Sequence, residues 1–372
     1  MIALLTSACA GKTVGAGPDG ALLGDGELVV AGAVDANDDS LSFDDSDQPD
    51  QPDAPAPTPS GNISMARANW TTGAMQAEVY AQLLEELGYQ VDRGTDLAPS
   101  EFYPELAAGT YDFWANSWPI VHDKFFDAPS DDGGLIGDRI SYVGQQMPVG
   151  GLQGILVDVA TADRLGISSL DDIAENPDIR AEFDTDGDGR AEIAGCDEGW
   201  GCEAVIDALI EDNGWADVLV QMKGVHGELF TQQVARAEAG EPVLAYVWTP
   251  GPFITELTPG ENAVWLGVKN PSPDQAVAAD LPEDQCRLSP CTMGFSPSDI
   301  VVAANNDFLA REPAAAELLN QVKISVLDVS FQNLKMGNGE DTPTDIARHA
   351  SEWIQSNRSD VDRWLTQAQA AG

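Results

Sequence analysis

The sequence predicts an α/β fold, because stretches with helical and strand-like spacing of apolar residues alternate along most of the chain. The chain has 372 residues, of which 43% are hydrophobic and nine are Trp, so it can bury a substantial core in two domains or one large one. Apart from the extreme N-terminus, no apolar run approaches the roughly 18 residues that span a bilayer.

The first predicted element after residue 61 is a helix followed by a short strand. Apolar side chains recur at helical spacing from Val79 to Leu87, and Gly88 provides a stop signal before the strand. Strands and helices then alternate to the C-terminus. The predicted strands are YVGQQM, GILVD, PVLAYVWT, AVWLGV and IVVAAN; a helix is predicted to start at TADRLG, and others to cover CEAVIDALIEDNGW, AREPAAAELLNQV and SEWIQSNRSDVDRWLTQA.

The charge balance excludes one class of partner. The chain has 18 Lys plus Arg against 62 Asp plus Glu, which gives a formal net charge of −44. Such a surface repels phosphate backbones, so no nucleic-acid partner is expected. It also repels small anions and tolerates zwitterions and cations as ligands.

Four of the five cysteines form close pairs, Cys196 with Cys202 and Cys286 with Cys291. Zinc sites and disulfides are the competing interpretations. Structural zinc prefers shorter Cys spacing with His partners, and neither pair has a His close in sequence. We therefore favour small disulfide loops in an exported protein.

The N-terminal segment predicts export and membrane anchoring. Residues 1–9 resemble a truncated signal peptide with a lipobox-like end, which would make Cys9 a lipidated N-terminus; the alternative is an ordinary signal remnant with an incidental Cys. Residues 35–61 are rich in Asp and Pro and nearly free of large apolar side chains. Residues 10–61 are therefore predicted to be a disordered acidic tether.

The sequence lacks the usual signatures of an enzyme. It contains three His and no G-x-S-x-G, H-E-x-x-H, P-loop or G-x-G-x-x-G motif. A nucleophilic or zinc-dependent active site would have to be built from very few residues. A binding protein that performs no chemistry and requires no cofactor is the better interpretation.

Trp-centred segments are the strongest candidates for a binding site. YDFWANSWPIVHD carries Trp118 and His122, CDEGWGCEAVIDALI carries Trp200 within a Cys loop, and LAYVWTPGPF carries Trp248 at the end of an apolar strand. Binding clefts of open α/β sheets lie at such strand ends. Trp70 could add a further wall to such a site, but a structural role is the favoured interpretation. Core packing is expected for Trp215, Trp265, Trp353 and Trp364.

An Asp-rich loop predicts a structural calcium ion. Carboxylates alternate along FDTDGDGRAEIAG as in an EF-hand loop, although Gly195 occupies the position of the bidentate Glu. The alternative is a solvated Asp-Gly turn. The predicted ligands are Asp184, Asp186, Asp188, the Arg190 carbonyl and Glu192.

From residue 62 onwards the chain resembles the glycine betaine/proline betaine-binding proteins of osmoprotectant ABC importers. The resemblance rests on LLEELGY, W-x3-HD, QGILVD, FDTDGDGRAEIAGCDEGWGCEAVID, GEPVLAYVWTP, ENAVWLGV and REPAAAELL. It implies a type II periplasmic-binding-protein fold, with two α/β lobes and a ligand cleft between them. Lobe 1 would hold residues 62–152 plus 296–372, and lobe 2 residues 153–295.

The resemblance also implies a binding site for each end of a betaine. A quaternary ammonium has no N–H group, so it is best held by aromatic faces through cation–π attraction. The family's cage indoles match Trp118, Trp200 and Trp248, and its His matches His122. The backbone N–H groups of Gly201 and Cys202, at the start of a predicted helix, suit the ligand carboxylate.

These inferences predict an extracytoplasmic monomer, anchored through Cys9, that delivers glycine betaine or proline betaine to an ABC permease in the inner membrane. Choline or another quaternary ammonium compound is an alternative ligand. A solute-sensing receptor module and a calcium-dependent adhesive module are alternative functions.

Overall fold

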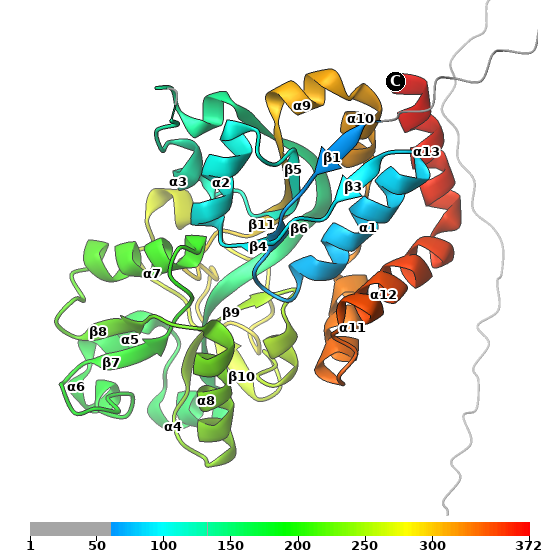
Figure 1. The fold of residues 1–372 in the computed structure, drawn as a ribbon. Coiled ribbons are helices and arrows are strands. Elements are labelled where there is room, and N and C mark those ends of the chain that lie inside the picture. Colours follow the sequence, from blue (N-terminus) through cyan, green and yellow to red (C-terminus); the bar gives the residue numbers. More distant parts are fainter. Residues whose placement is uncertain (1–60, 132) are drawn as a thin grey trace, which may run out of the picture. The chain divides into compact units, whose positions relative to one another are not determined.

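The computed structural model describes residues 61–131 and 133–372. Cys9, the predicted signal segment 1–9 and residues 10–60 of the predicted tether lie outside the described residues. Strands and helices alternate along the described chain, so the predicted α/β class is confirmed (Figure 1). None of the helices in this part of the chain has the length and apolar character needed to cross a membrane.

The N-terminal part of the described chain begins with the predicted helix and strand. The helix α1 (Gly73–Glu86) buries Val79, Leu83 and Leu84 completely, and Gly88 follows it with a φ of 104°, a left-handed conformation that favours glycine. The elements up to residue 139 are β1 (Asn62–Ser64), β2 (Arg67–Ala68), α1 (Gly73–Glu86), β3 (Gln90–Asp92), β4 (Asp96–Leu97), α2 (Pro99–Ala108), β5 (Phe113–Ser117), α3 (Asp123–Phe126) and η1 (Ile136–Asp138).

One long strand, β6 (Ile140–Asp158), runs through the centre of the main sheet. Its first part pairs antiparallel with β11 (Ser298–Asn305), and its second part pairs antiparallel with β9 (Leu244–Thr249). The partner changes between Gly151 and Leu152. YVGQQM and GILVD, each predicted to be a strand, are both strand in the structure, but they belong to this one continuous strand.

The chain between β6 and β11 adds β7 (Ala191–Ala194) and β8 (Leu219–Met222) to the sheet in the order β6-β9-β7-β8. It also pairs β10 (Ala263–Trp265) with β6 and covers the sheet with helices (Figure 1). The β7–β8 and β7–β9 pairs are parallel. The elements are α4 (Val159–Leu165), α5 (Leu170–Glu175), α6 (Pro177–Arg180), β7 (Ala191–Ala194), α7 (Gly201–Asp212), β8 (Leu219–Met222), α8 (His226–Glu238), η2 (Pro252–Thr255), β10 (Ala263–Trp265) and η3 (Pro273–Gln275).

The C-terminal segments form more helices than the sequence predicts. AREPAAAELLNQV is divided at Glu312, because the residue before a proline is disfavoured in the helical conformation. SEWIQSNRSDVDRWLTQA is divided at Asn357, which caps one helix and precedes the next. The helices are α9 (Asn306–Arg311), α10 (Pro313–Gln321), α11 (Val326–Gly337), α12 (Pro343–Ser356) and α13 (Arg358–Ala371).

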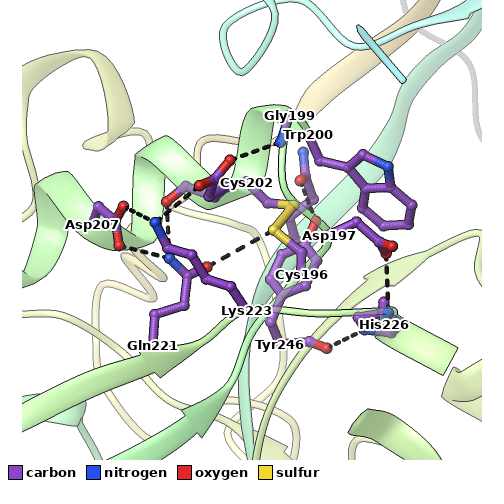
Figure 2. Close-up of a disulfide and its surroundings, with 12 residues drawn as sticks. Cys196, Asp197, Gly199, Trp200, Cys202, Asp207, Gln221, Lys223, His226 and Tyr246 are labelled. Atoms are coloured by element: carbon purple, nitrogen blue, oxygen red, sulfur yellow. Dashed lines mark hydrogen bonds and ion pairs between the residues drawn. A yellow bond between two sulfur atoms is a disulfide. The ribbon is translucent and has the colours of Figure 1, made fainter. Parts of the chain in front are cut away.

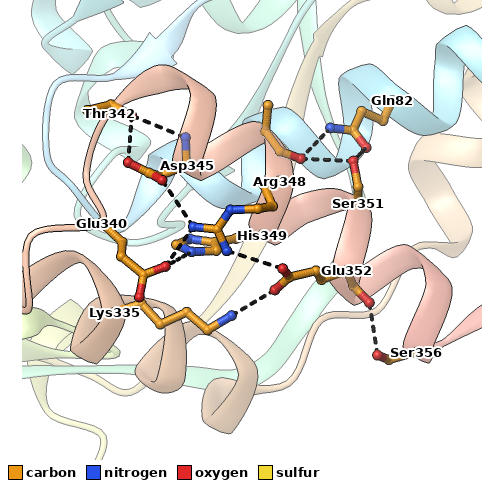
Figure 3. Close-up of polar contacts among 11 residues, drawn as sticks. Gln82, Lys335, Glu340, Thr342, Asp345, Arg348, His349, Ser351, Glu352 and Ser356 are labelled. Atoms are coloured by element: carbon orange, nitrogen blue, oxygen red, sulfur yellow. Dashed lines mark hydrogen bonds and ion pairs between the residues drawn. The ribbon is translucent and has the colours of Figure 1, made fainter.

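Helix α12 is attached to its neighbours by packing and by an ion-pair cluster. It packs against α1, and its buried face includes Trp353, which stacks on Trp364 of α13 at a ring distance of 6.4 Å. Arg348 lies 2.6 Å from Glu340 and 3.1 Å from Glu352 (Figure 3). These groups are half exposed and their attraction is screened by solvent, so packing dominates.

The four Trp side chains expected to pack in the core are buried. Their exposed fractions are between 2% and 8%, which confirms the prediction of core packing. They are Trp215, Trp265, Trp353 and Trp364.

Candidate functional site

A cavity lies where β6 changes its strand partner. It is enclosed by the segment after β5, the first turn of α7 and the strands β6 and β9. All of the binding residues predicted from the sequence line it, together with residues that were not predicted. The lining residues are Trp70, Pro99, Trp118, Val121, His122, Gln153, Trp200, Gly201, Cys202, Tyr246 and Trp248.

Strand β6 provides one wall of the cavity. A Cβ on Gly151 would lie 2.5 Å from Cζ3 of Trp118, so glycine allows this indole to lie directly on the strand. Gln153, two residues further on, is paired with Trp248 of β9. Gly151 and Gln153 share one face of the sheet, because alternate residues of a strand point to the same side. The indole over Gly151, Trp118, and the indole paired with Gln153, Trp248, therefore lie along that face.

A turn after β5 fixes Trp118 and His122. The C=O of Trp118 accepts from the N–H of His122 (3.0 Å), and the N–H of Trp118 donates to Nδ1 of His122 (3.2 Å). The indole Nε1–H of Trp118 donates to Asn116 Oδ1 at 2.7 Å. Both side chains are therefore oriented by hydrogen bonds to neighbouring protein groups.

These contacts also fix the tautomer of His122. Burial, aided by the charge of Lys124, lowers the pKa of His122 to about 3, so the ring is neutral at ordinary pH. Because Nδ1 accepts from the Trp118 N–H, the proton lies on Nε2. Nε2 hydrogen-bonds to no group of the described chain and is available to a ligand.

A short disulfide loop presents Trp200. Cys196 and Cys202 are bonded to each other with a Cα–Cα distance of 6.5 Å, and between them Gly199 has a φ of 83° (Figure 2). The indole Nε1–H of Trp200 donates to Asn69 Oδ1 at 2.9 Å. The loop thus directs the indole toward the segment that precedes α1.

The first turn of α7 supplies backbone donors next to this indole. Trp200 is the N-cap residue, and Gly201 and Cys202 are the first residues of the helix. The first N–H groups of a helix have no partner within it, and they lie at the positive end of its dipole. Both residues line the cavity, so this end of α7 can accept an anionic group.

Trp248 is supported by His226. The rings of Trp248 and Trp200 lie 5.6 Å apart at 81°, and His226 lies 4.7 Å from Trp248 and 6.1 Å from Trp200. Nε2 of His226 donates to the C=O of Tyr246 at 2.8 Å, and burial lowers the pKa of His226 to about 4 (Figure 2). A neutral ring therefore supports the two indoles from behind.

The structure brings all the predicted cavity residues together and adds others. Trp70, which was expected to be structural, forms part of the wall, with its ring 5.4 Å from that of Trp200. Sequence reasoning missed Pro99, Val121, Gln153 and Tyr246 as lining residues. Only the position of Tyr246, two residues before Trp248 on a predicted strand, gave a signal for any of these four.

The second cysteine pair lies outside the cavity wall. Cys286 and Cys291 are bonded with a Cα–Cα distance of 6.1 Å and pack in a core cluster with Trp265. The disulfide pairing predicted from the sequence is therefore confirmed for both pairs.

The Asp-rich loop between α6 and β7 brings part of the predicted ligand set together. Oxygen atoms of Asp184, Asp186 and Asp188 lie within 4.8 Å of one another. The Glu192 carboxylate instead accepts hydrogen bonds from backbone N–H groups of the loop, the shorter of them 2.7 Å long. The Arg190 guanidinium pairs with Asp188 at 2.5 Å.

Comparison with known proteins identifies the family. Residues 61–356 match the family described as the substrate-binding domain of ABC-type glycine betaine transport systems. The glycine betaine-binding periplasmic protein OusX of Dickeya dadantii is 33% identical over 299 residues, which cover 80% of this chain and 86% of OusX. The glycine betaine/proline betaine-binding periplasmic protein of Escherichia coli is 30% identical and covers 83% of this chain and 90% of its own.

A solved structure supports the same fold. An ABC-transporter choline-binding protein in complex with choline has a TM-score of 0.63 and 17% identity, and the match covers 83% of this chain and 96% of that one.

The relatives named above are periplasmic, and disulfides persist in oxidising compartments, so an extracytoplasmic location is indicated. The chain belongs to the substrate-binding domain family of ABC-type glycine betaine transport systems.

Proposed function

We propose that this chain binds glycine betaine, or a close relative such as proline betaine, and delivers it as a monomer to an ABC permease of the inner membrane for osmoprotection. The observation that carries the proposal is the meeting of Trp118, Trp200 and Trp248, from segments far apart in sequence, in the wall of one cavity. Indole faces attract a quaternary ammonium by about 2 kcal/mol per desolvated contact. Family membership supports the same ligand class.

The polar groups of the cavity favour a zwitterion over a simple cation. Nε2–H of His122 and the backbone N–H groups of Gly201 and Cys202 are donors that suit a carboxylate. No Asp or Glu is found among the described residues that line the cavity. Choline would leave these donors without a charged acceptor, which costs affinity.

The proposed lobes are residues 62–152 with 296–372, and residues 153–295. The change of β6 partner between Gly151 and Leu152 supports this boundary. Trp118 and His122 then belong to lobe 1, and Trp200 and Trp248 to lobe 2, so a bound ligand touches both. Closure of such lobes is a hinge motion, and the closed form is the state that a permease would recognise.

Calorimetric titration of the chain with glycine betaine and with choline tests the ligand assignment. We expect glycine betaine to bind at least tenfold more tightly, since a charge-assisted hydrogen bond contributes roughly 1.5–3 kcal/mol. Tighter binding of choline would show that the N–H donors do not hold a carboxylate, and it would make choline the favoured ligand in place of glycine betaine.

Binding should not be linked to proton uptake between pH 6.0 and 7.5. The pKa of His122 is lowered to about 3, so the ring is neutral in this range. A bound carboxylate favours the protonated ring, but at pH 6 it would have to raise this pKa by about three units, or roughly 4 kcal/mol. The binding enthalpy should therefore be the same in buffers of different ionisation enthalpy. Uptake approaching one proton at pH 6 would contradict the neutral donor.

Removing the Cys196–Cys202 disulfide should affect binding more than stability. A loop this short contributes about 2 kcal/mol to stability, so replacing both Cys by Ser should lower the melting temperature by a few degrees. Affinity for glycine betaine should fall at least tenfold, because the loop positions Trp200 and the donors of α7.

The second disulfide provides a matched control. Replacing Cys286 and Cys291 by Ser removes a loop of similar length that does not line the cavity. We expect a comparable change in melting temperature with unchanged affinity, measured by scanning calorimetry and titration. Equal losses of affinity in both variants would assign the first disulfide a purely structural role.

The calcium prediction for the loop that contains Asp184, Asp186 and Asp188 can be tested by chelation. If the loop holds a structural calcium ion, EDTA should lower the melting temperature by a few degrees, and calcium but not magnesium should restore it. Asp186→Asn should abolish this response. An unchanged melting curve and the absence of copurified metal would show that the loop is a solvated turn without a metal ion.

Lipidation of Cys9 remains a prediction.

A further inference from the structure

Gln153 lines the cavity, and the binding site described above gives it no role. It is on β6, only 4% exposed, and paired with Trp248 across the β6–β9 ladder. Directly paired residues on neighbouring strands point to the same side of the sheet, with their Cβ atoms about 5 Å apart. The Gln153 amide therefore lies beside one of the proposed cage indoles.

A buried phenol fixes the orientation of this amide. The Tyr246 hydroxyl donates to Oε1 of Gln153 at 2.7 Å. Burial raises the pKa of Tyr246 well above its usual range, so the phenol keeps its proton and remains a donor. With Oε1 occupied by this bond, the NH2 group is the free end of the amide.

The NH2 group has no acceptor among the residues that the structure describes. Nε2 of Gln153 is buried and makes no hydrogen bond with the described chain. An unsatisfied buried donor is costly, and such groups in native structures call for a partner. The described residues of the wall include no carboxylate, and an oxygen of a bound ligand can supply the missing acceptor.

We propose that Nε2 of Gln153 donates a hydrogen bond to an oxygen of the bound ligand and so selects onium compounds that carry a carboxylate. This inference rests on the proposed function and adds a side-chain donor to His122 and the α7 backbone. Tyr246 acts through Gln153 as a positioning residue.

The test compares ligands with and without the oxygen in Gln153→Met, which keeps the side-chain length and removes the amide. Titration of the full chain should show that affinity for glycine betaine falls about ten- to a hundredfold, the effect of losing a hydrogen bond to a charged group. Affinity for tetramethylammonium, which has no oxygen, should change less than threefold. Gln146→Met is the control, because Gln146 is also buried on β6 and does not line the cavity. It should leave both affinities unchanged.

Tyr246→Phe provides a second variant that keeps the amide. The ring volume is preserved while Oε1 of Gln153 loses its donor, so the amide can turn over. We expect a smaller loss for glycine betaine, between the parent and Gln153→Met, and again little change for tetramethylammonium. This variant also decides the question if Gln153→Met does not fold.

The outcomes separate this inference from the function on which it rests. If the parent binds glycine betaine but Gln153→Met and Tyr246→Phe bind it equally well, or lose both ligands equally, the donor role is overturned and the function stands. If the parent does not bind glycine betaine, the proposed function fails and this inference fails with it.

Discussion

Replacing Trp200 by Ala is expected to weaken glycine betaine binding by about a hundredfold or more. The loss combines a cation–π contact of about 2 kcal/mol with the removal of an apolar wall, and each 1.4 kcal/mol corresponds to about tenfold in affinity. Trp200 contacts both Trp70 and Trp248, so its deletion also loosens the adjacent indoles. Trp200→Phe should retain part of the affinity, because a smaller aromatic face still attracts the cation.

The control for this variant is a buried Trp away from the cavity. Trp364→Ala removes an indole that stacks on Trp353 in the C-terminal helices and does not line the cavity. It should lower the melting temperature while leaving the affinity of the folded protein unchanged. Calorimetric titration of all three variants is the measurement. Parent-like binding by a correctly folded Trp200→Ala would show that this indole does not hold the ligand.

Gly201→Ala should reduce affinity by at least about thirtyfold for a steric reason. A Cβ at this position would lie 2.5 Å from the backbone oxygen of Val121 and 3.0 Å from Cδ2 of His122. The backbone cannot yield as a flexible side chain would, so the turn carrying His122 must move away from α7. In the proposed lobes this contact crosses the cleft, and the added methyl group opposes closure around the ligand. A misplacement of about 1 Å at such a site is enough to lose most of the binding contacts.

The same substitution should not harm the fold of either lobe. Ala is favoured over Gly at a helical position whose conformation it can adopt, so the melting temperature without ligand should stay within a few degrees of the parent. Gly337→Ala in α11 is the matched control, because its added Cβ would meet nothing within 4 Å. We expect it to bind like the parent. Unchanged affinity in Gly201→Ala would mean that the Val121 segment and α7 separate without loss of binding.

Elements whose signals are local were predictable from the sequence. The helix α7 and the strand β9 carry their apolar patterns within a few residues, so Trp200 at the helix start and Trp248 near the strand end were correctly located. The spacing of Trp118 and His122 corresponds to the turn observed after β5. The close Cys spacing similarly predicted both disulfides.

Features that depend on distant partners were not predictable. The continuity of β6 comes from pairing with strands more than 80 residues away, and no local pattern reports that register. Gln153 is recognisable as a cavity residue only through its pairing with Trp248. Trp70 is similarly placed by tertiary contact with Trp200 and not by a motif of its own.

The central claim is that the cavity holds a quaternary ammonium by indole faces and a carboxylate by N–H donors. Its most direct test is calorimetric titration of the full chain with glycine betaine and with glycine, which share the carboxylate and differ in the methyl groups on nitrogen. The ammonium group of glycine donates N–H hydrogen bonds, and indole faces are poorer acceptors of these bonds than water is. We therefore expect glycine betaine to bind at least about a hundredfold more tightly than glycine. Equal affinities for the two compounds, or no heat of binding with glycine betaine, would contradict the cage.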